Sequence, residues 1–135
     1  MIKNLKLQAD PDNYKKFMDF VQSQIDGSCA NNNIVSDIMI VSEEVVVNII
    51  DYAYPDKKGD LEVIFEKTGD LIRIIFKDEG APFDPLKKPE PDINKPIEER
   101  DIGGFGILLV KKLMDEVTYE YKENNNVLTV IKRIT

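Results

Sequence analysis

An apolar run rich in valine and isoleucine covers residues 32 to 54 and constrains the fold of this chain most. The run is far longer than a typical strand, which favours a buried helix. Spacings of 7, 4 and 3 residues separate Asp37, Glu44, Asn48 and Asp51. Because successive helical residues turn by about 100°, these four side chains fall on one narrow stripe. The run therefore predicts a long helix, apolar nearly all round, with one line of polar groups.

The remaining patterns predict an α+β domain with a mainly antiparallel sheet. We expect strands at residues 2–8, 61–67, 71–78, 117–122 and 127–133, and further helices at 11–26 and 103–115. Hairpin turns are expected at residues 68–70 and 123–126. Because neither a repeat nor a linker divides the sequence, residues 1–135 are predicted to form a single domain. A long segment rich in proline and charge, at about 80–102, is typical of a functional loop.

Composition excludes several classes of function. The formal net charge of −7 argues against a nucleic-acid partner, which requires a basic face. The chain contains no histidine, so acid–base chemistry must use carboxylates, lysine or tyrosine. The single cysteine, the lack of a secretory pattern and the lack of a membrane-length apolar run lead us to expect a cytoplasmic protein with no membrane association.

Glu44 and Asn48 lie one turn apart on the predicted long helix. An amide oxygen is a suitable ligand for magnesium, and a neighbouring carboxylate could deprotonate a hydroxyl group. The alternative is that the polar stripe is only the solvent face of the helix.

Two further motifs and one single residue are compatible with a ligand site. Asp78 ends an apolar strand and is followed by Gly80, so the carboxylate could accept a hydrogen bond from an exocyclic amine; an ordinary Asx turn is the alternative. The segment from Gly103 to Gly106 opens a helix, where free amides could bind phosphates, but it could equally serve as a hinge and N-cap. Thr129 interrupts the last apolar strand, where threonine is also an ordinary strand residue.

In this order, the motifs resemble the ATP-binding fold shared by DNA gyrase, sensor histidine kinases and the mismatch-repair protein MutL. The matching segments are Glu44 to Asn48, Asp78 to Pro85 and Gly103 to Val110. The resemblance is greatest to the small bacterial branch that contains the anti-sigma-factor serine kinases. It implies a two-layer α/β sandwich, with a mixed, mostly antiparallel sheet and helices on one face.

The resemblance also implies roles for individual residues. Asn48 would hold the magnesium ion that bridges the ATP phosphates, and Glu44 would be the catalytic base for a serine hydroxyl. Asp78 would bind the adenine amino group with help from Thr129, and Gly80 would let the base approach. The other nucleotide-binding positions are expected at Asp51, Phe83, Gly103, Gly104, Phe105, Gly106 and Ile107.

Two features of the family pattern concern the phosphates. Residues 84–102 would form an ATP lid, with Lys87, Lys88, Lys95 and Arg100 as candidates to face the phosphates. Asp51 stands where the kinases of this branch commonly carry histidine. An acid beside bound phosphates is repelled unless it contacts a metal, water or the sugar, so the phosphate geometry is expected to differ here.

Three functions follow from these expectations. The first is a serine kinase that uses ATP and Mg²⁺ to phosphorylate a small antagonist protein, with a sigma factor as its alternative partner and a homodimer expected by analogy. The second is a non-catalytic module whose protein binding depends on nucleotide. The third is an acidic scaffold that binds no nucleotide.

Overall fold

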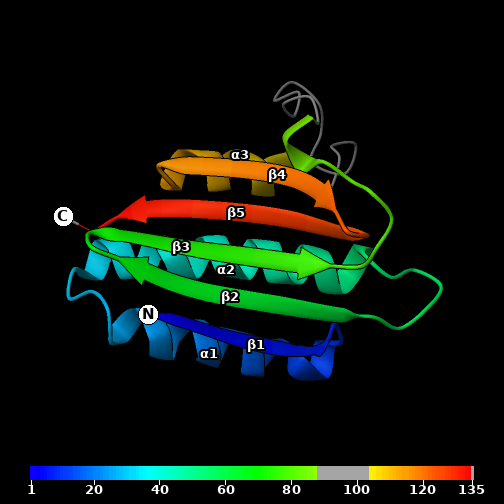
Figure 1. Cartoon of the computed structure of the whole chain (residues 1–135), viewed down its shortest axis with the longest axis horizontal. Coiled ribbons are helices and arrows are strands. Elements are labelled where there is room, and N and C mark those ends of the chain that lie inside the picture. Colours follow the sequence, from blue (N-terminus) through cyan, green and yellow to red (C-terminus); the bar gives the residue numbers. More distant parts are fainter. Residues whose placement is uncertain (88–103, 135) are drawn as a thin grey trace.

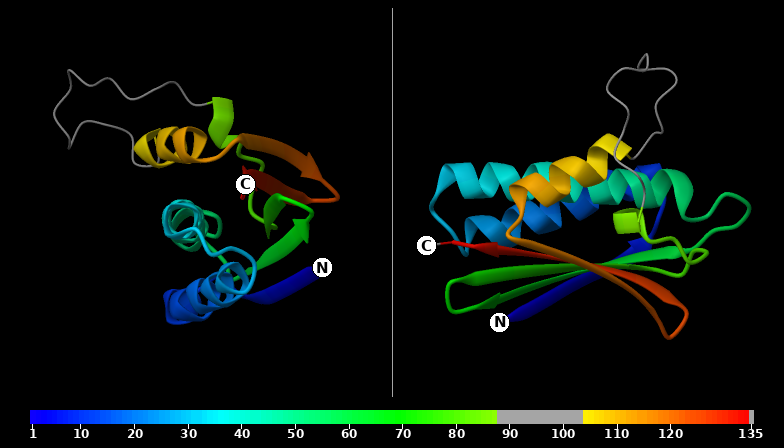
Figure 2. Two further views of the ribbon diagram at one scale, coloured as in Figure 1. Left: turned by 90° about the vertical axis from the view of Figure 1, so that its left-hand side faces the viewer. Right: turned by 90° about the horizontal axis from the view of Figure 1, so that it is seen from above.

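The computed structural model describes residues 1–87 and 104–134. A five-stranded sheet forms one layer, and Figure 2 shows the three α-helices together on one side of it. The elements, in chain order, are β1 (Ile2–Gln8), the 3₁₀ turn η1 (Pro11–Asn13), α1 (Tyr14–Asp26), α2 (Asn32–Tyr52), β2 (Asp60–Thr68), β3 (Leu71–Asp78), the 3₁₀ turn η2 (Pro85–Lys87), α3 (Gly104–Leu113), β4 (Glu116–Lys122) and β5 (Asn125–Arg133). The predicted α+β class is confirmed.

The strands lie in the order β1-β2-β3-β5-β4, which places the last strand in the chain next to β3 (Figure 1). All pairings among the described residues are antiparallel. The expected mixed sheet therefore contains no parallel pair in this part of the chain. In the β3–β5 pairing, Asp78 lies opposite Asn126. This register brings the end of β3 to the start of β5.

The first helical segment begins differently from the single helix expected at residues 11–26. Asp10 Oδ1 accepts a hydrogen bond of 2.8 Å from the backbone N–H of Asp12, and the next turn is 3₁₀. The α-helix starts only at Tyr14 and reaches Asp26. It buries Phe17, Val21 and Ile25, which recur every four residues and so share one face.

The long apolar run forms the central helix α2, as predicted. Asn31 caps its N-terminus by accepting hydrogen bonds from the backbone N–H groups of Asn33 and Ile34, at 2.9 and 3.2 Å. Its apolar side packs into a core shared with α1, α3 and the inner face of the sheet. No helix in the described part of the chain has the length and apolarity needed to cross a membrane.

The turn before β5 occupies fewer residues than expected. Positive φ angles occur at Glu123 (54°) and Asn124 (64°), which is the conformation of a two-residue hairpin turn. β5 consequently starts at Asn125, two residues before the predicted start at 127. Asn126 therefore belongs to the strand.

Candidate functional site

A pocket of about 500 Å³ lies between α2, α3 and one end of the sheet. We call it the α2–α3 pocket. Its lining residues are Val45, Asn48, Ile49, Tyr52, Ala53, Pro55, Phe76, Asp78, Ala81, Pro82, Phe83, Pro85, Ile107, Val110, Tyr119, Asn126 and Leu128. Most of these are apolar, and only a few polar groups stand among them. Such a lining suits a flat organic ring that is oriented by specific hydrogen bonds.

Asp78 is the acidic side chain that lines this pocket, and it is 7% exposed. Its Oδ1 accepts hydrogen bonds from the backbone N–H of Gly80 at 2.9 Å and from Asn126 Nδ2 at 3.0 Å. Burial raises the pKa of Asp78, and these two hydrogen bonds offset part of the rise. The Asx turn is therefore present, and it uses Oδ1; Oδ2 makes no hydrogen bond to the described part of the chain and is the oxygen available to a ligand.

Asn126 and Tyr119 line the pocket but were not predicted as site residues. Asn126 was assigned to a turn, although strand alternation could have found it. Leu128 and Val130 are buried on the inner face, and a period of two residues places Asn126 on that same face. Tyr119 pairs with Leu128 across β4 and β5, so its side chain reaches the same end of the sheet.

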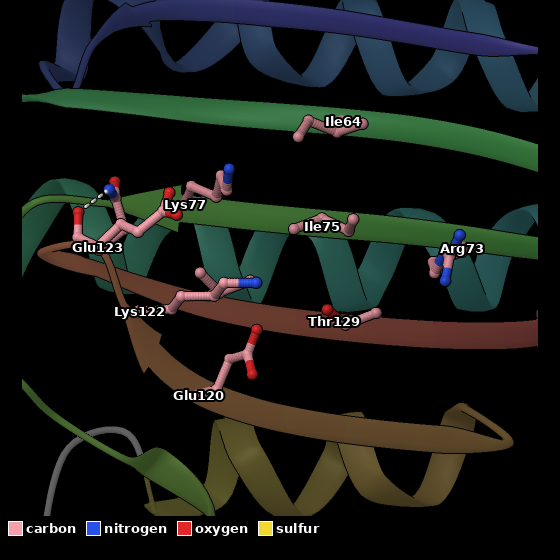
Figure 3. Close-up of a pocket in the computed structure, with 10 residues that line it drawn as sticks. Ile64, Arg73, Ile75, Lys77, Glu120, Lys122, Glu123 and Thr129 are labelled. Atoms are coloured by element: carbon pink, nitrogen blue, oxygen red, sulfur yellow. Dashed lines mark hydrogen bonds between the residues drawn. The ribbon is translucent and has the colours of Figure 1, made fainter.

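The structure does not bring Thr129 together with Asp78. Thr129 pairs with Ile75 and lies between the buried residues Leu128 and Val130, so it faces away from the core. Figure 3 shows Thr129 beside Ile75 on the sheet face opposite the helices, where it lines a separate pocket of about 340 Å³. The expectation that Thr129 assists Asp78 is therefore corrected, and Asn126 makes that contact.

The polar stripe of α2 contributes unequally to the pocket. Asn48 lines the pocket, and its side chain makes no hydrogen bond among the described residues. Glu44 is half-buried one turn earlier, but it is not a lining residue; Asp51 is exposed and also lies outside the lining. Asp37 instead approaches Lys132 of β5, with an N–O distance of 3.8 Å. Of the four residues in the stripe, only Asn48 therefore lines the pocket.

Gly80 is required by the protein's own packing. A Cβ atom at this position would lie 2.6 Å from the carbonyl oxygen of Ala53 and 2.9 Å from Asp78 Oδ1. The Ala53 carbonyl therefore accounts for the glycine at this position, and the approach of a base to Gly80, which is not a lining residue, stays an expectation. Phe83 does line the pocket, and the residue is 54% exposed.

The glycine segment is described only in part. Gly104, Phe105 and Gly106 form the first turn of α3, and Ile107 of the same helix lines the pocket. The predicted contacts of these glycines with phosphates remain an expectation. Gly103 and the lid candidates Lys88, Lys95 and Arg100 lie outside the described residues, while Lys87 ends η2.

Comparison with known proteins places this arrangement in a family. The histidine kinase-like ATPase domain matches residues 7–132. The chain belongs to this family. Among curated proteins, "Serine-protein kinase RsbW" of Bacillus cereus strain ATCC 10987 is 33% identical over 98 residues, and the protein of that name in Bacillus mycoides strain KBAB4 is 34% identical over 98 residues.

The matched region covers 70% of this chain and 61% of each of these relatives. A third relative of the same name, from Bacillus cereus strain B4264, is 35% identical over the same share of each chain. The chain thus spans about three fifths of the length of these kinases.

Proposed function

We propose that this chain binds ATP in the α2–α3 pocket and transfers the terminal phosphoryl group to a serine of a small protein partner. One observation carries the proposal: a single pocket is lined by both Asn48 of α2 and Asp78 of β3. These are the residues expected to bind the phosphate-bridging metal and the adenine amino group. Membership of the histidine kinase-like ATPase family and similarity to serine-protein kinases support it.

The end of the pocket near Asp78 suits adenine. The apolar side chains of Ile49, Phe76 and Ile107 offer surfaces against which a flat base can pack. Asp78 Oδ2 is available to accept a hydrogen bond from the exocyclic amine. Because an ionised carboxylate only accepts hydrogen bonds, it favours an amine over a carbonyl oxygen at that position.

Asn48 suits a magnesium ion that arrives with the nucleotide. Its amide oxygen is a hard ligand, and its side chain has no other hydrogen-bond partner in the described part of the chain. No cluster of three or more acidic or cysteine side chains that could enclose a metal occurs within residues 1–87 and 104–134. One amide ligand fits a magnesium ion whose other ligands are phosphate oxygens and water. When bound, the ion would neutralise phosphate charge.

Glu44 is the proposed base for phosphoryl transfer. In the proposed reaction, the serine oxygen forms a bond to the γ-phosphorus, the bond from that phosphorus to the β–γ bridging oxygen breaks, and ADP leaves. Glu44 takes the proton of the serine hydroxyl. The residue lies one helical turn before Asn48, which places the two side chains on the same face of α2.

Calorimetric titration with Mg-ATP tests nucleotide binding. We expect saturable binding that requires magnesium and is lost in Asn48→Ala. Asn33→Ala is the matched control, because Asn33 is an exposed asparagine on the same helix. Absence of binding to the unchanged protein, or equal binding by both variants, would contradict the proposed site.

Incubation with labelled ATP and a candidate antagonist protein tests the transfer. We expect labelled phosphoserine on the antagonist, with a loss of at least about a hundredfold in rate for Glu44→Gln. Glu43→Gln is the control, since Glu43 is the exposed neighbouring residue. Unchanged transfer by Glu44→Gln would remove Glu44 from the mechanism.

A second candidate function is a nucleotide-dependent protein-binding module that transfers no phosphate. The observation in its favour is that Glu44 does not line the α2–α3 pocket. In this case Mg-ATP would change the affinity for a partner such as a sigma factor, and no phosphoserine would form. Equal partner affinity with and without Mg-ATP, measured by surface plasmon resonance, would reject this candidate.

A further inference from the structure

The amide group of Asn126 lies at the centre of the hydrogen bonds at the Asp78 end of the pocket. The residue is 7% exposed. Its Nδ2 lies 3.0 Å from Asp78 Oδ1, 3.3 Å from the Gly80 carbonyl oxygen and 3.0 Å from the Ala81 carbonyl oxygen. One amide nitrogen therefore holds both the carboxylate that ends β3 and the turn that follows it.

The amide oxygen of Asn126 faces two donors. It accepts a hydrogen bond of 3.0 Å from the backbone N–H of Phe83 and another from the hydroxyl of Tyr119. A backbone N–H can only donate, and the carbonyl groups on the other side can only accept. These neighbours fix the orientation of the amide, so it is Nδ2 that points to Asp78.

This arrangement uses the full hydrogen-bonding capacity of Asn126. Its two amide hydrogens are shared among three acceptors, and its oxygen accepts from two donors. Asn126 therefore has nothing left to offer a ligand, although it lines the pocket. Any influence on a ligand must act through Asp78. Without Asn126, the Gly80 N–H would be the one remaining partner of the Asp78 carboxylate within residues 1–87 and 104–134, and the carboxylate could rotate.

We infer that Asn126, with Tyr119, is a positioning residue that aims Asp78 Oδ2 into the pocket and thereby sets its preference for a nucleobase with an exocyclic amine. This inference rests on the proposed function, because it requires that the pocket holds a nucleotide. A base with a carbonyl oxygen at the same position would face the carboxylate oxygen and be repelled. Discrimination between the two kinds of base requires a carboxylate with a fixed orientation, since a carboxylate that rotates could move its oxygen away from the carbonyl oxygen of the wrong base.

Parallel titrations with Mg-ATP and Mg-inosine triphosphate test the inference, because the two bases present an amine and a carbonyl at the same position. We expect the unchanged protein to bind ATP at least about tenfold more tightly. In Asn126→Ala the ratio of ATP affinity to inosine triphosphate affinity should fall towards one, mainly through weaker ATP binding. Tyr119→Phe should give a smaller fall. Asn125→Ala is the matched control, because the Asn125 side chain donates to Glu123 in the turn, and its ratio should not change.

Two outcomes separate this inference from the proposed function. If the unchanged protein binds neither nucleotide, the proposed function fails and the inference fails with it. If the protein binds ATP but Asn126→Ala weakens both nucleotides equally or leaves the ratio intact, only the inference is overturned. An equal loss would indicate a purely structural role.

A measurement without nucleotide examines the same contact. Titration of the Asp78 carboxyl group by NMR should give a higher pKa in Asn126→Ala, because Asn126 donates to the ionised form. Asn125→Ala should leave this pKa unchanged. If Asn126→Ala does not fold, the ratio of ATP affinity to inosine triphosphate affinity in Tyr119→Phe decides the question, since that variant removes one hydroxyl group from Asn126. An unaltered Asp78 pKa in folded Asn126→Ala would overturn the positioning role.

Discussion

The hydroxyl of Tyr54 accepts a hydrogen bond of 2.6 Å from the backbone N–H of Glu79, the residue that follows Asp78. The same hydroxyl donates a hydrogen bond of 2.6 Å to the carbonyl oxygen of Asp60, where β2 begins. The Tyr54 ring also packs closely on Gly59, at which a Cβ atom would come within 2.0 Å of ring carbon Cε1. Tyr54 thus joins the segment after α2 to the strand end that carries Asp78.

Tyr54→Phe should lower the free energy of unfolding by about 0.5–1.5 kcal/mol, because the change removes a hydroxyl that bonds both a backbone N–H and a backbone carbonyl. Urea denaturation measures the difference. Tyr121→Phe is the matched control, since Tyr121 is 43% exposed on β4 and its hydroxyl makes no hydrogen bond within the described residues. Equal stability of the Tyr54 variant and the control would show that water replaces these contacts without cost.

Gly80→Ala should lower the free energy of unfolding by about 1–3 kcal/mol, because the new methyl group would overlap the Ala53 carbonyl oxygen and displace it. The same displacement should weaken ATP binding, since Asp78 Oδ1 lies against the new methyl group. Gly27→Ala provides the control: its Cβ atom would meet only the carbonyl oxygens of Ser23 and Gln24, at 3.7 and 3.8 Å. Chemical denaturation and calorimetry of both variants check the contrast. A Gly80 variant as stable as the Gly27 variant would mean that the Ala53 backbone moves freely.

The elements of this fold could be predicted where one physical signal dominates. The length of the run from 32 to 54 and the spacing of its polar residues indicate a helix, and α2 spans Asn32–Tyr52. Alternating or continuous apolar residues indicate the strands, because a sheet buries one face against the helices. Asn48 and Asp78 could be placed in one site only through the order of the motifs, since long-range pairing brings them together.

The errors arose where several residues fit a local role equally well. Three consecutive asparagines, Asn124 to Asn126, all tolerate turn conformations, so composition does not say where the turn stops. The pairing of Asp78 with Asn126 decides the register. The close approach of the Ala53 carbonyl to Gly80 could not be predicted either, because Ala53 lies more than twenty residues earlier in the chain.

Asp78→Asn should make the nucleotide-free protein more stable near neutral pH while weakening ATP binding. Burial raises the pKa of Asp78 in the folded state, so the folded protein binds this proton more tightly than the unfolded chain does. Protonated Asp78 therefore contributes its full stabilisation to the folded protein below the ordinary carboxyl pKa. This contribution is lost as the pH rises through the higher pKa that Asp78 has in the folded state. The amide keeps an oxygen for Gly80 and Asn126 but never ionises.

The difference in unfolding free energy between Asp78→Asn and the unchanged protein should consequently grow from about pH 4 towards pH 7. Urea denaturation at a series of pH values measures it. Asp56→Asn, in the exposed loop before β2, is the control, and its difference in unfolding free energy from the unchanged protein should stay constant with pH. A constant difference for Asp78→Asn would mean that ionisation of Asp78 does not oppose folding.

Ser42→Ala should raise the free energy of unfolding, by about 1 kcal/mol. Ser42 is 0% exposed on α2, and its Oγ has no hydrogen-bond partner among the described residues. A buried hydroxyl without a partner opposes folding, because it loses its hydrogen bonds to water. Alanine removes that group and is also the better helix former.

Ser28→Ala is the opposing control: Ser28 is nearly buried, but its Oγ donates a hydrogen bond of 2.8 Å to the Gln24 carbonyl oxygen. The two serine variants should therefore move the urea midpoint in opposite directions at constant m value. A loss of stability in Ser42→Ala would indicate that water or a ligand satisfies the hydroxyl in solution.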